Sequence, residues 1–288
     1  ATISTASPVI CEGGSATVDF SGTLDADVAY TVNGGAPQTI RLSTPSAADP
    51  AIGEASITQV LSADTRYALV SVATTGAVPC SAALTGFIDI TVTPLPTGTI
   101  AATDATVCEG TGTTIIFTGP AGGTVTYAIG AGAGTTATLD AAGTYSLPTG
   151  NLSAGQTYRL LGVSTGGAVP CSRTLNLQAT VSVKALPTAV ITGPANVCSN
   201  RTAELEITGT PGATVSFTWN AGADTDTVLL DGAGYALYTT QAITATTTFS
   251  LASAVSGGTP SCTAALAGSV TITPIAASAS QRPMKPIA

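Results

Sequence analysis

The sequence contains no histidine and very little charge. Charged residues make up 8% of the 288 residues, and the only lysines are Lys184 and Lys285. Without histidine, neither a Ser-His-Asp triad nor a Cys-His pair can form. Two lysines, one near a predicted linker and one near the end, make a Ser-Lys dyad improbable. The sequence therefore predicts a protein that is not an enzyme and that needs no cofactor.

Basic runs and long apolar runs are also missing. The net charge is −8, and no basic run could neutralise phosphates, so nucleic acid is excluded as a partner. Asp, Pro and Gly interrupt every apolar stretch before the roughly 18 residues needed to cross a bilayer, so no membrane span is expected. The sequence starts at Ala1 without Met or a charged-then-apolar leader. That start is expected of a mature chain whose signal peptide was removed.

One pattern occurs three times at intervals of 91 residues. An aromatic residue stands thirteen positions before a cysteine, and a leucine eleven positions before it, in 67–80, 158–171 and 249–262. The aromatic and the leucine share one face of a strand, and a Gly-containing loop follows them. The repeat predicts module 1 at residues 1–96, module 2 at 97–187 and module 3 at 188–274, followed by a Pro-containing tail at 275–288.

Apolar residues alternate at matching positions in all three modules, and no helical period is found. Short alternating segments separated by Gly, Pro, Asn and Asp, in units near 90 residues, are typical of a β-sandwich. The predicted fold is all-β, a tandem array of three immunoglobulin-like antiparallel β-sandwich domains. The predicted core aromatics are Phe20, Tyr30, Tyr67, Phe117, Tyr127, Tyr158, Phe217, Trp219 and Phe249.

Two cysteines fall in each module, and none is left over. Zinc is disfavoured because the chain has neither histidine nor closely spaced cysteine pairs. The spacing favours disulfides within modules, and we predict the pairs Cys11–Cys80, Cys108–Cys171 and Cys198–Cys262. Each would contribute about 4 kcal/mol in the chain-entropy model. Such bonds persist only in an oxidising compartment, so an extracellular or cell-surface location is expected.

Pairs of carboxylates at i, i+2 spacing are the remaining chemical candidates. Glu204 with Glu206, Asp25 with Asp27, and Asp224 with Asp226 could each face one way on a strand and act as a glycosidase couple. The pairs do not recur at one equivalent position, so a solvated surface is the favoured interpretation. The aspartates, together with Asp19, leave a calcium site open as an alternative.

The cysteine-containing segments resemble a known family. Val107–Gly110, the similar 10–13 segment, the Tyr-x-Leu strand and the 94–97 linker resemble immunoglobulin-like repeats of secreted surface adhesins and filament proteins from Bacteroidota. The third copy departs from the pattern, with Cys198-Ser199-Asn200 in place of Cys-Glu-Gly. The resemblance implies a repeat type found in adhesins, filaments and secreted enzymes alike.

These observations predict a structural subunit of an extracellular bacterial filament or adhesin stalk. Its partner would be the chain itself, in a head-to-tail homopolymer held by the opening strand or by the 275–288 tail. The alternative is a carbohydrate- or surface-binding repeat region of a larger secreted adhesin or hydrolase, with cell-surface glycans as partners. That alternative needs an exposed aromatic cluster, whereas aromatics make up only 5% of the chain and mostly occupy predicted core positions.

Overall fold

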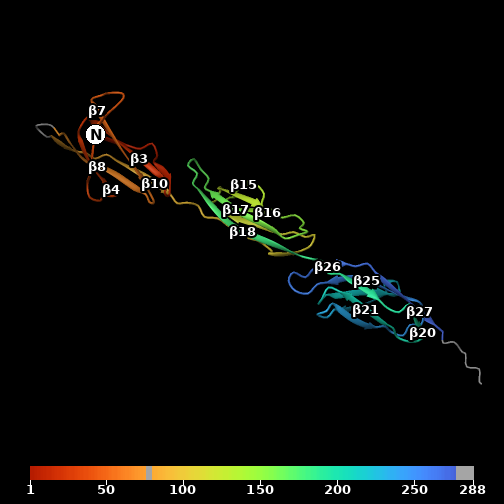
Figure 1. Cartoon of the computed structure of the whole chain (residues 1–288). Helices are drawn as coiled ribbons and strands as arrows, with labels where there is room; N and C mark the ends of the chain where they lie inside the picture. The colour runs from red at the N-terminus through yellow and green to blue at the C-terminus, as the bar shows by residue number, and fades with distance from the viewer. Residues whose placement is uncertain (76–79, 277–288) are drawn as a thin grey trace, which may run out of the picture. The chain divides into compact units, whose positions relative to one another are not determined.

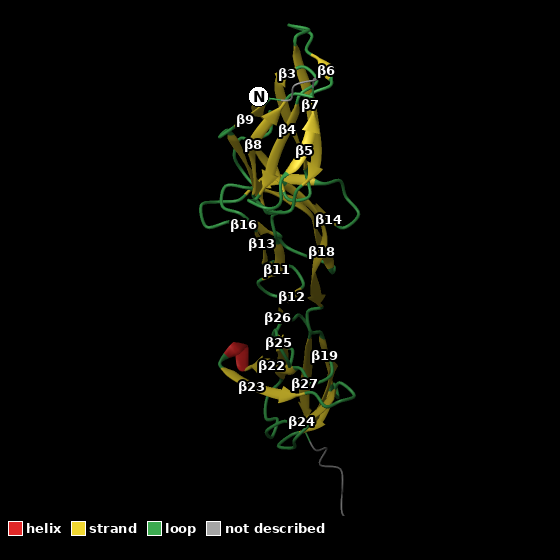
Figure 2. Cartoon of the chain, turned by 90° about the vertical axis from the view of Figure 1, so that its left-hand side faces the viewer, coloured by secondary structure: helices red, strands yellow, loops and turns green. Residues whose placement is uncertain are grey.

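The computed structural model describes residues 1–75 and 80–276, and these are almost entirely strand and loop (Figures 1 and 2). A single-turn 3-10 helix, η1 (Asn220–Gly222), is present in module 3. In the described part of the chain, no helix is long and apolar enough to span a membrane. The predicted all-β, immunoglobulin-like fold class is confirmed.

Module 1 folds into two sheets. One has the order β1-β3-β7-β6, and the other has the order β2-β10-β8-β4-β5 with β9 paired to β8. Side chains from both sheets meet in one core, where Phe20 of the first sheet contacts Tyr30 of the second at a ring distance of 5.0 Å. The strands are β1 (Thr2–Ser4), β2 (Val9–Cys11), β3 (Ser15–Thr23), β4 (Asp27–Val32), β5 (Gln38–Arg41), β6 (Thr44–Pro45), β7 (Ile52–Val60), β8 (Thr65–Ala73), β9 (Ser81–Ala83) and β10 (Phe87–Thr93).

Module 2 repeats this plan with sheet orders β11-β13-β16 and β12-β18-β17-β14-β15. Its smaller sheet has no counterpart of β6. The strands are β11 (Thr99–Ala102), β12 (Thr106–Cys108), β13 (Thr114–Thr118), β14 (Thr124–Ile129), β15 (Thr135–Thr138), β16 (Thr144–Pro148), β17 (Gln156–Ser164) and β18 (Ser172–Lys184).

Module 3 has the sheet orders β19-β21-β24 and β20-β27-β25-β22-β23, with β26 paired to β25. Its last strand continues to Ile275, one residue into the segment predicted as a tail, and residues 277–288 of that tail lie outside the described residues. The strands are β19 (Ala189–Thr192), β20 (Asn196–Cys198), β21 (Glu204–Gly209), β22 (Thr214–Trp219), β23 (Asp224–Leu229), β24 (Tyr235–Thr239), β25 (Thr247–Val255), β26 (Thr263–Ala265) and β27 (Ser269–Ile275).

The chain divides into two compact units that do not coincide with the three modules. The first unit contains Ala1–Ala101, Ile116–Ser146 and Tyr158–Gln178. The second contains Ala102–Ile115, Leu147–Thr157 and the chain from Ala179 onward. The module boundaries stay a prediction, and the module names are kept for the predicted ranges.

The same central pairing builds every core. A tyrosine or phenylalanine on one strand lies opposite the leucine of the repeat on its neighbour, and a β-bulge directly precedes that aromatic residue each time. Eight of the predicted core aromatics are buried, whereas Trp219 is half-buried and packs between Phe217 and Phe249. The three pairs are Tyr30 with Leu69, Tyr127 with Leu160, and Phe217 with Leu251.

Candidate functional site

The first cysteine of each module ends a short strand that runs parallel to the last strand of that module. This placement brings the cysteine beside the final residue of the last strand, where the chain leaves the module. The opposed residues are Cys11 with Thr93, Cys108 with Lys184, and Cys198 with Ile275.

A tight turn with a left-handed residue follows each first cysteine. Gly13, Gly110 and Asn200 have φ values of 76°, 78° and 64° at equivalent positions. Glycine adopts this conformation without a Cβ clash, and asparagine tolerates it better than most residues. The cysteine carbonyl accepts the closing hydrogen bond in each turn, at 2.8–3.1 Å. The Cys-Ser-Asn segment of module 3 therefore forms the same turn as Cys-Glu-Gly.

The second cysteine of each module lies in a loop and makes the same two hydrogen bonds. Its carbonyl accepts a hydrogen bond from the backbone N–H of a hydroxyl residue six positions earlier, and its own N–H donates to that hydroxyl. The distance from the donating backbone nitrogen to the cysteine carbonyl oxygen is 2.9 Å for Thr74 and Cys80, 2.8 Å for Thr165 and Cys171, and 2.8 Å for Ser256 and Cys262.

These positions show why the predicted pairing within modules is wrong. In module 1, Cys80 directly precedes β9, which pairs with β8 at Ala73. Cys11 lies beside Thr93, beyond the opposite end of β8 at Thr65. Nine residues of extended strand span about 26 Å, whereas a disulfide needs Cα atoms within about 7 Å. The two cysteines of one module lie at opposite ends of its sheet.

The disulfides instead join successive modules. Cys11 bonds Cys171 and Cys108 bonds Cys262, each with a Cα–Cα distance of 5.5 Å. The predicted pairs Cys11–Cys80, Cys108–Cys171 and Cys198–Cys262 are thereby corrected. In both bonds the first cysteine of one module reaches the second-cysteine loop of the following module. Such bonds indicate a secreted or surface protein.

Polar contacts accompany both junctions. Beside the Cys11–Cys171 bond, Leu95 of the linker donates its N–H to the Glu12 carboxylate at 3.2 Å. Beside the Cys108–Cys262 bond, the Lys184 ammonium donates to the carbonyls of Gly257 and Pro260 at 2.5 and 3.0 Å. Lys184 is thus a docking residue between modules.

The remaining two cysteines stand at positions equivalent to those in the bonds. Cys198 is an exposed free thiol on the first-cysteine turn of module 3. Cys80 is exposed on the second-cysteine loop of module 1, whereas its counterparts Cys171 and Cys262 are fully buried.

The carboxylate candidates lie at exposed or half-buried positions of modules 1 and 3. The Arg41 guanidinium lies 3.5 Å from the Asp25 carboxylate and 3.8 Å from the Asp27 carboxylate. Glu204 and Glu206 share the exposed face of β21. Asp224 accepts a hydrogen bond from the Asn220 amide. Within the described residues, no group of three or more carboxylates and cysteines is placed to hold a metal ion.

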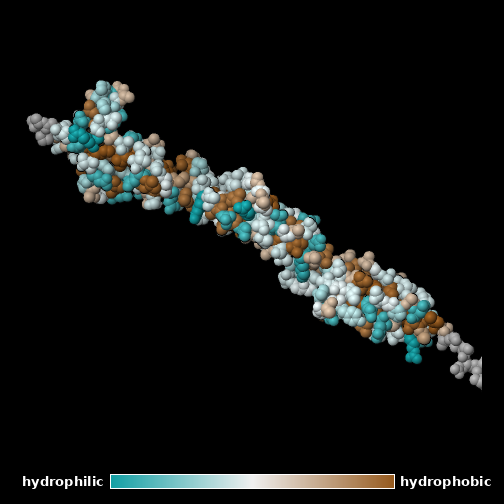
Figure 3. All heavy atoms as spheres, viewed as in Figure 1, coloured by the Kyte–Doolittle hydropathy of each residue, from teal (hydrophilic) through white to brown (hydrophobic). Residues whose placement is uncertain are grey.

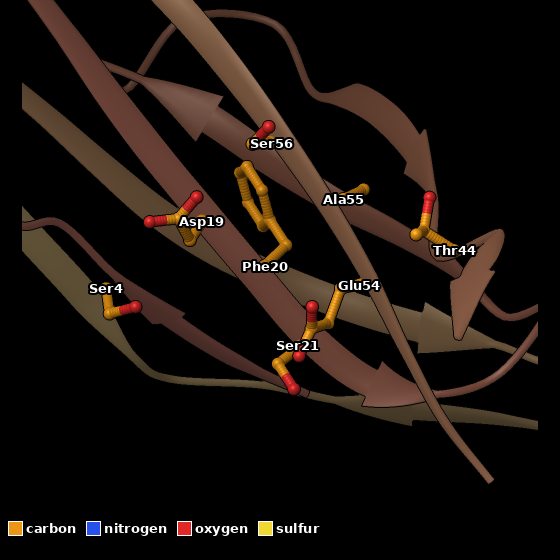
Figure 4. A pocket seen from close by; sticks show the side chains of 8 residues that line it. All are labelled: Ser4, Asp19, Phe20, Ser21, Thr44, Glu54, Ala55 and Ser56. Atoms are coloured by element: carbon orange, nitrogen blue, oxygen red, sulfur yellow. The ribbon is translucent and has the colours of Figure 1, made fainter. Parts of the chain in front are cut away.

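A shallow polar face lies on the outer side of the smaller sheet of module 1 (Figure 4). Carboxylates and hydroxyls project from neighbouring strands, because residues that alternate along β3 and β7 share one side of the sheet. Phe20 and Ala55 point the other way, and Phe20 is 1% exposed. The projecting side chains are Ser4, Asp19, Ser21, Thr44, Glu54 and Ser56.

The rest of the visible surface is sparsely charged. On the face drawn in Figure 3, strongly hydrophilic residues form small separate groups among neutral and apolar ones. Among the residues that the structure describes, the shortest ion pair is between Arg66 and Asp89, with two contacts of 2.6 and 2.8 Å. The Arg66 guanidinium also lies 4.4 Å from the centre of the exposed Phe87 ring.

Comparisons with known proteins are limited to overall structure. No protein-family model and no curated protein matches this sequence. Similar solved structures include one of a 1.5-MDa bacterial ice-binding adhesin, with 17% identity, a TM-score of 0.46, and coverage of 95% of this chain and 98% of that chain. A marsupial T cell receptor has 10% identity, a TM-score of 0.41, and coverage of 93% and 100%. An ICAM-5 ectodomain fragment has 12% identity, a TM-score of 0.37, and coverage of 95% and 77%. At these identities and TM-scores, none of them indicates what this chain does.

Proposed function

We propose that this chain is a structural subunit of an extracellular filament or adhesin stalk that assembles head to tail. The observation that carries the proposal is the pair of disulfides between modules, Cys11–Cys171 and Cys108–Cys262. A bond within a module would stabilise that module alone. A bond between modules holds neighbours together, which is what a load-bearing array requires. The resemblance to Bacteroidota surface repeats stays a prediction.

The covalent connectivity suits a protein under tension. The loops closed by the two disulfides overlap in sequence, because Cys108 lies inside the first loop and Cys171 inside the second. A force entering at Cys11 and leaving at Cys262 therefore has two covalent routes that share no bond with each other. One passes through the first bond and along 171–262, and the other passes along 11–108 and through the second bond. Breaking one route leaves the other intact.

Head-to-tail growth is supported by the surfaces that modules 1 and 3 carry. Module 1 has a second-cysteine loop and module 3 has a first-cysteine turn, the same two kinds of surface that each disulfide joins inside the chain. A contact between these unlike surfaces is heterologous, so it leaves the same two surfaces available at the ends and can propagate. The predicted exchange of the opening strand would require β1 to leave its partner β3. The exchange predicted for the tail falls on residues outside those described.

Negative-stain electron microscopy and light scattering of the purified chain test the proposal over a range of concentrations. We expect particles whose length and mass grow with concentration. Deleting 1–7 and, separately, 275–288 identifies the part played by the terminal segments. A monodisperse monomer at every concentration, under both oxidising and reducing conditions, would contradict the proposal.

The second candidate is glycan or surface binding at the polar face of module 1. Its carboxylates and hydroxyls could bind sugar hydroxyls, which is the observation in its favour. Its only aromatic lining residue, Phe20, points into the core, so this face has no ring on which a sugar could stack. A polysaccharide pull-down with the Asp19→Asn, Glu54→Gln double variant distinguishes the two candidates, because only a binding module would lose retention.

A further inference from the structure

We propose that module 3 binds a neutral sugar in a pocket at one end of its β-sandwich, where β22 and β24 end and β25 begins. The pocket has a volume of 220 Å³, which suits one sugar ring better than a long chain. It is a different site from the polar face of module 1, and it does not depend on head-to-tail assembly. The lining side chains that carry the argument are Trp219, Asn220, Tyr238, Gln241, Thr247 and Phe249.

The lining combines aromatic rings with neutral hydrogen-bonding groups. Trp219 and Tyr238 are both half-buried, so part of each side chain stays accessible to a ligand. An aromatic face packs against the C–H groups of a sugar ring, and amide and hydroxyl side chains exchange hydrogen bonds with its hydroxyls. Among the described residues that line the pocket, every polar side chain is neutral. That composition favours an uncharged sugar over a cation or an anion.

Trp219 stands where the other two modules have a smaller side chain. It ends β22 and packs against Phe249, with 5.7 Å between the ring centres. Module 3 therefore has an additional half-buried ring at this end of its sandwich. The equivalent pairs of modules 1 and 2 are Val32 with Tyr67 and Ile129 with Tyr158.

The amide of Gln241 belongs to the same difference between modules. In module 1, the Tyr67 hydroxyl donates to the Gln59 amide oxygen at 2.7 Å. Gln241 is the equivalent of Gln59, because each stands two residues before the carbonyl that bonds the left-handed residue of the first-cysteine turn. Phe249 takes the place of Tyr67 and has no hydroxyl to donate to Gln241. The equivalent residue of module 2, Gly150, has no side chain for a ligand.

Both walls of the pocket are held by the backbone. On one side, the Thr240 hydroxyl donates to the Gln241 carbonyl at 2.8 Å, and Ile243 forms a β-bridge with Arg201. On the other side, η1 (red in Figure 2) contacts β22, β23 and β25, and its three residues are left-handed, with φ values of 50°, 57° and 89°. Non-glycine residues seldom adopt this conformation, and such strain is concentrated at binding and active sites. Walls that are fixed before binding lose less entropy when the ligand binds.

The site can be observed directly, because Trp219 is the only tryptophan in the chain. Tryptophan fluorescence of the full chain therefore reports from this pocket alone. The chain is titrated with the methyl glycosides of glucose, galactose, mannose and N-acetylglucosamine, and with tetramethylammonium chloride as a cationic probe. We expect a saturable change in Trp219 emission with at least one glycoside and no change with tetramethylammonium.

Two variants test the residues. Trp219→Ile gives module 3 the residue that module 2 has at this position, and it should abolish binding in saturation-transfer NMR, which needs no tryptophan. Gln241→Ala, at an exposed position, keeps the fluorophore and should weaken the affinity about tenfold through the lost hydrogen bond. The matched controls are Tyr235→Ala, at a ring 38% exposed outside the pocket, and Gln178→Ala, at an exposed amide of module 2, and both should bind like the wild type.

Several results would overturn the inference. They are an unchanged emission with all four glycosides, full affinity in Gln241→Ala, or saturation transfer retained in folded Trp219→Ile. Circular dichroism establishes whether each variant is folded, and Gln241→Ala decides alone if Trp219→Ile is not. A response to tetramethylammonium without any response to the glycosides would also overturn it, because that result assigns the rings to an aromatic cage for a cation.

Discussion

At the scale of single residues, the core aromatics decide whether a module folds. Phe217 is fully buried at the centre of the module 3 core, beside Trp219 and Tyr238. Its burial comes from the strand alternation visible in the sequence, which places every second residue of β22 on one face. A side chain of this size with no solvent exposure leaves a cavity when it is truncated.

We expect Phe217→Ala to lower the free energy of unfolding of module 3 by about 3–5 kcal/mol, from lost burial and the cavity left behind. The matched control is Leu229→Ala, at a position 68% exposed, which should change it by no more than about 0.5 kcal/mol. Hydrogen exchange resolved by residue measures both. Linear arrays unfold largely module by module, so equal loss of protection in modules 1 and 3 would contradict the prediction.

The Arg66–Asp89 pair makes stability depend on pH at another single site. The hydrogen bonds from Arg66 favour the charged carboxylate and hold the pKa of Asp89 below its ordinary value. The stabilisation is therefore present above the ordinary pKa of an aspartate and is lost as the pH falls through the lowered value. We expect a carboxyl NMR titration of Asp89 to show the lowered pKa, and Arg66→Gln to return it toward the ordinary range. An unchanged pKa in Arg66→Gln would assign the shift to another cause.

At the scale of elements, the turn after the first cysteine determines where that cysteine points. Gly110 has a φ of 78°, and a methyl group added at its Cα would have no neighbouring atom within 4 Å. The cost of a side chain at this position therefore comes from the left-handed backbone alone. The Asn200 turn shows that a residue with a side chain can occupy this conformation.

Gly110→Ala is expected to destabilise the fold by about 1–2 kcal/mol, the cost of a left-handed conformation for an L-residue. Gly232→Ala is the matched control, because a Cβ there also meets no atom within 4 Å and its φ is not positive. Chemical denaturation compares the two variants. Equal effects at both positions would show that the left-handed conformation of Gly110 is not the cause.

At the scale of the whole molecule, the overlapping disulfides set how far the chain can be stretched. The Cys11–Cys171 bond removes 160 residues from the extensible length, and the Cys108–Cys262 bond spans 154. Because the two loops overlap, the second bond removes no further length while the first is intact. The first bond therefore sets the maximum extension of the chain. The second bond leaves that extension unchanged and adds another covalent route that can carry the force.

In single-molecule stretching of one chain, reductant should lengthen the fully extended chain by on the order of 550 Å, at about 3.5 Å per residue. Replacing only Cys108 and Cys262 by Ser should leave the oxidised length unchanged. Replacing only Cys11 and Cys171 should add about 20 Å, because the other bond still holds 154 residues. Three separate, shorter increments on reduction would instead support disulfides within modules.

Much of this molecule could be predicted from local pattern. Alternating apolar residues identify strands because side chains on a strand point to opposite faces in turn, and that rule needs no knowledge of the neighbouring strands. The all-β fold class and the aromatic residues at recurring positions follow from it. Tyr30 and Phe217 are buried because each occupies an inward position on a central strand.

The disulfide pairing could not be predicted in the same way. Regular spacing of two cysteines per module suggests a bond inside each module, but spacing along the chain does not report which end of a sheet each cysteine occupies. The sequence does show that Cys80 precedes the last strand of module 1. The structure adds that Cys11 lies beside the final residue of that strand, at its other end.

The sequence by itself determined the repeat, the strands and the identity of the core residues, because these depend on side-chain periodicity and local backbone preference. Only the tertiary structure decided which cysteines meet. Parallel pairing of a three-residue strand carries Cys11 and Cys108 to the ends of their sheets where the chain passes to the next module. A disulfide forms between sulfurs that are adjacent in space, and here the adjacent sulfur belongs to the following module.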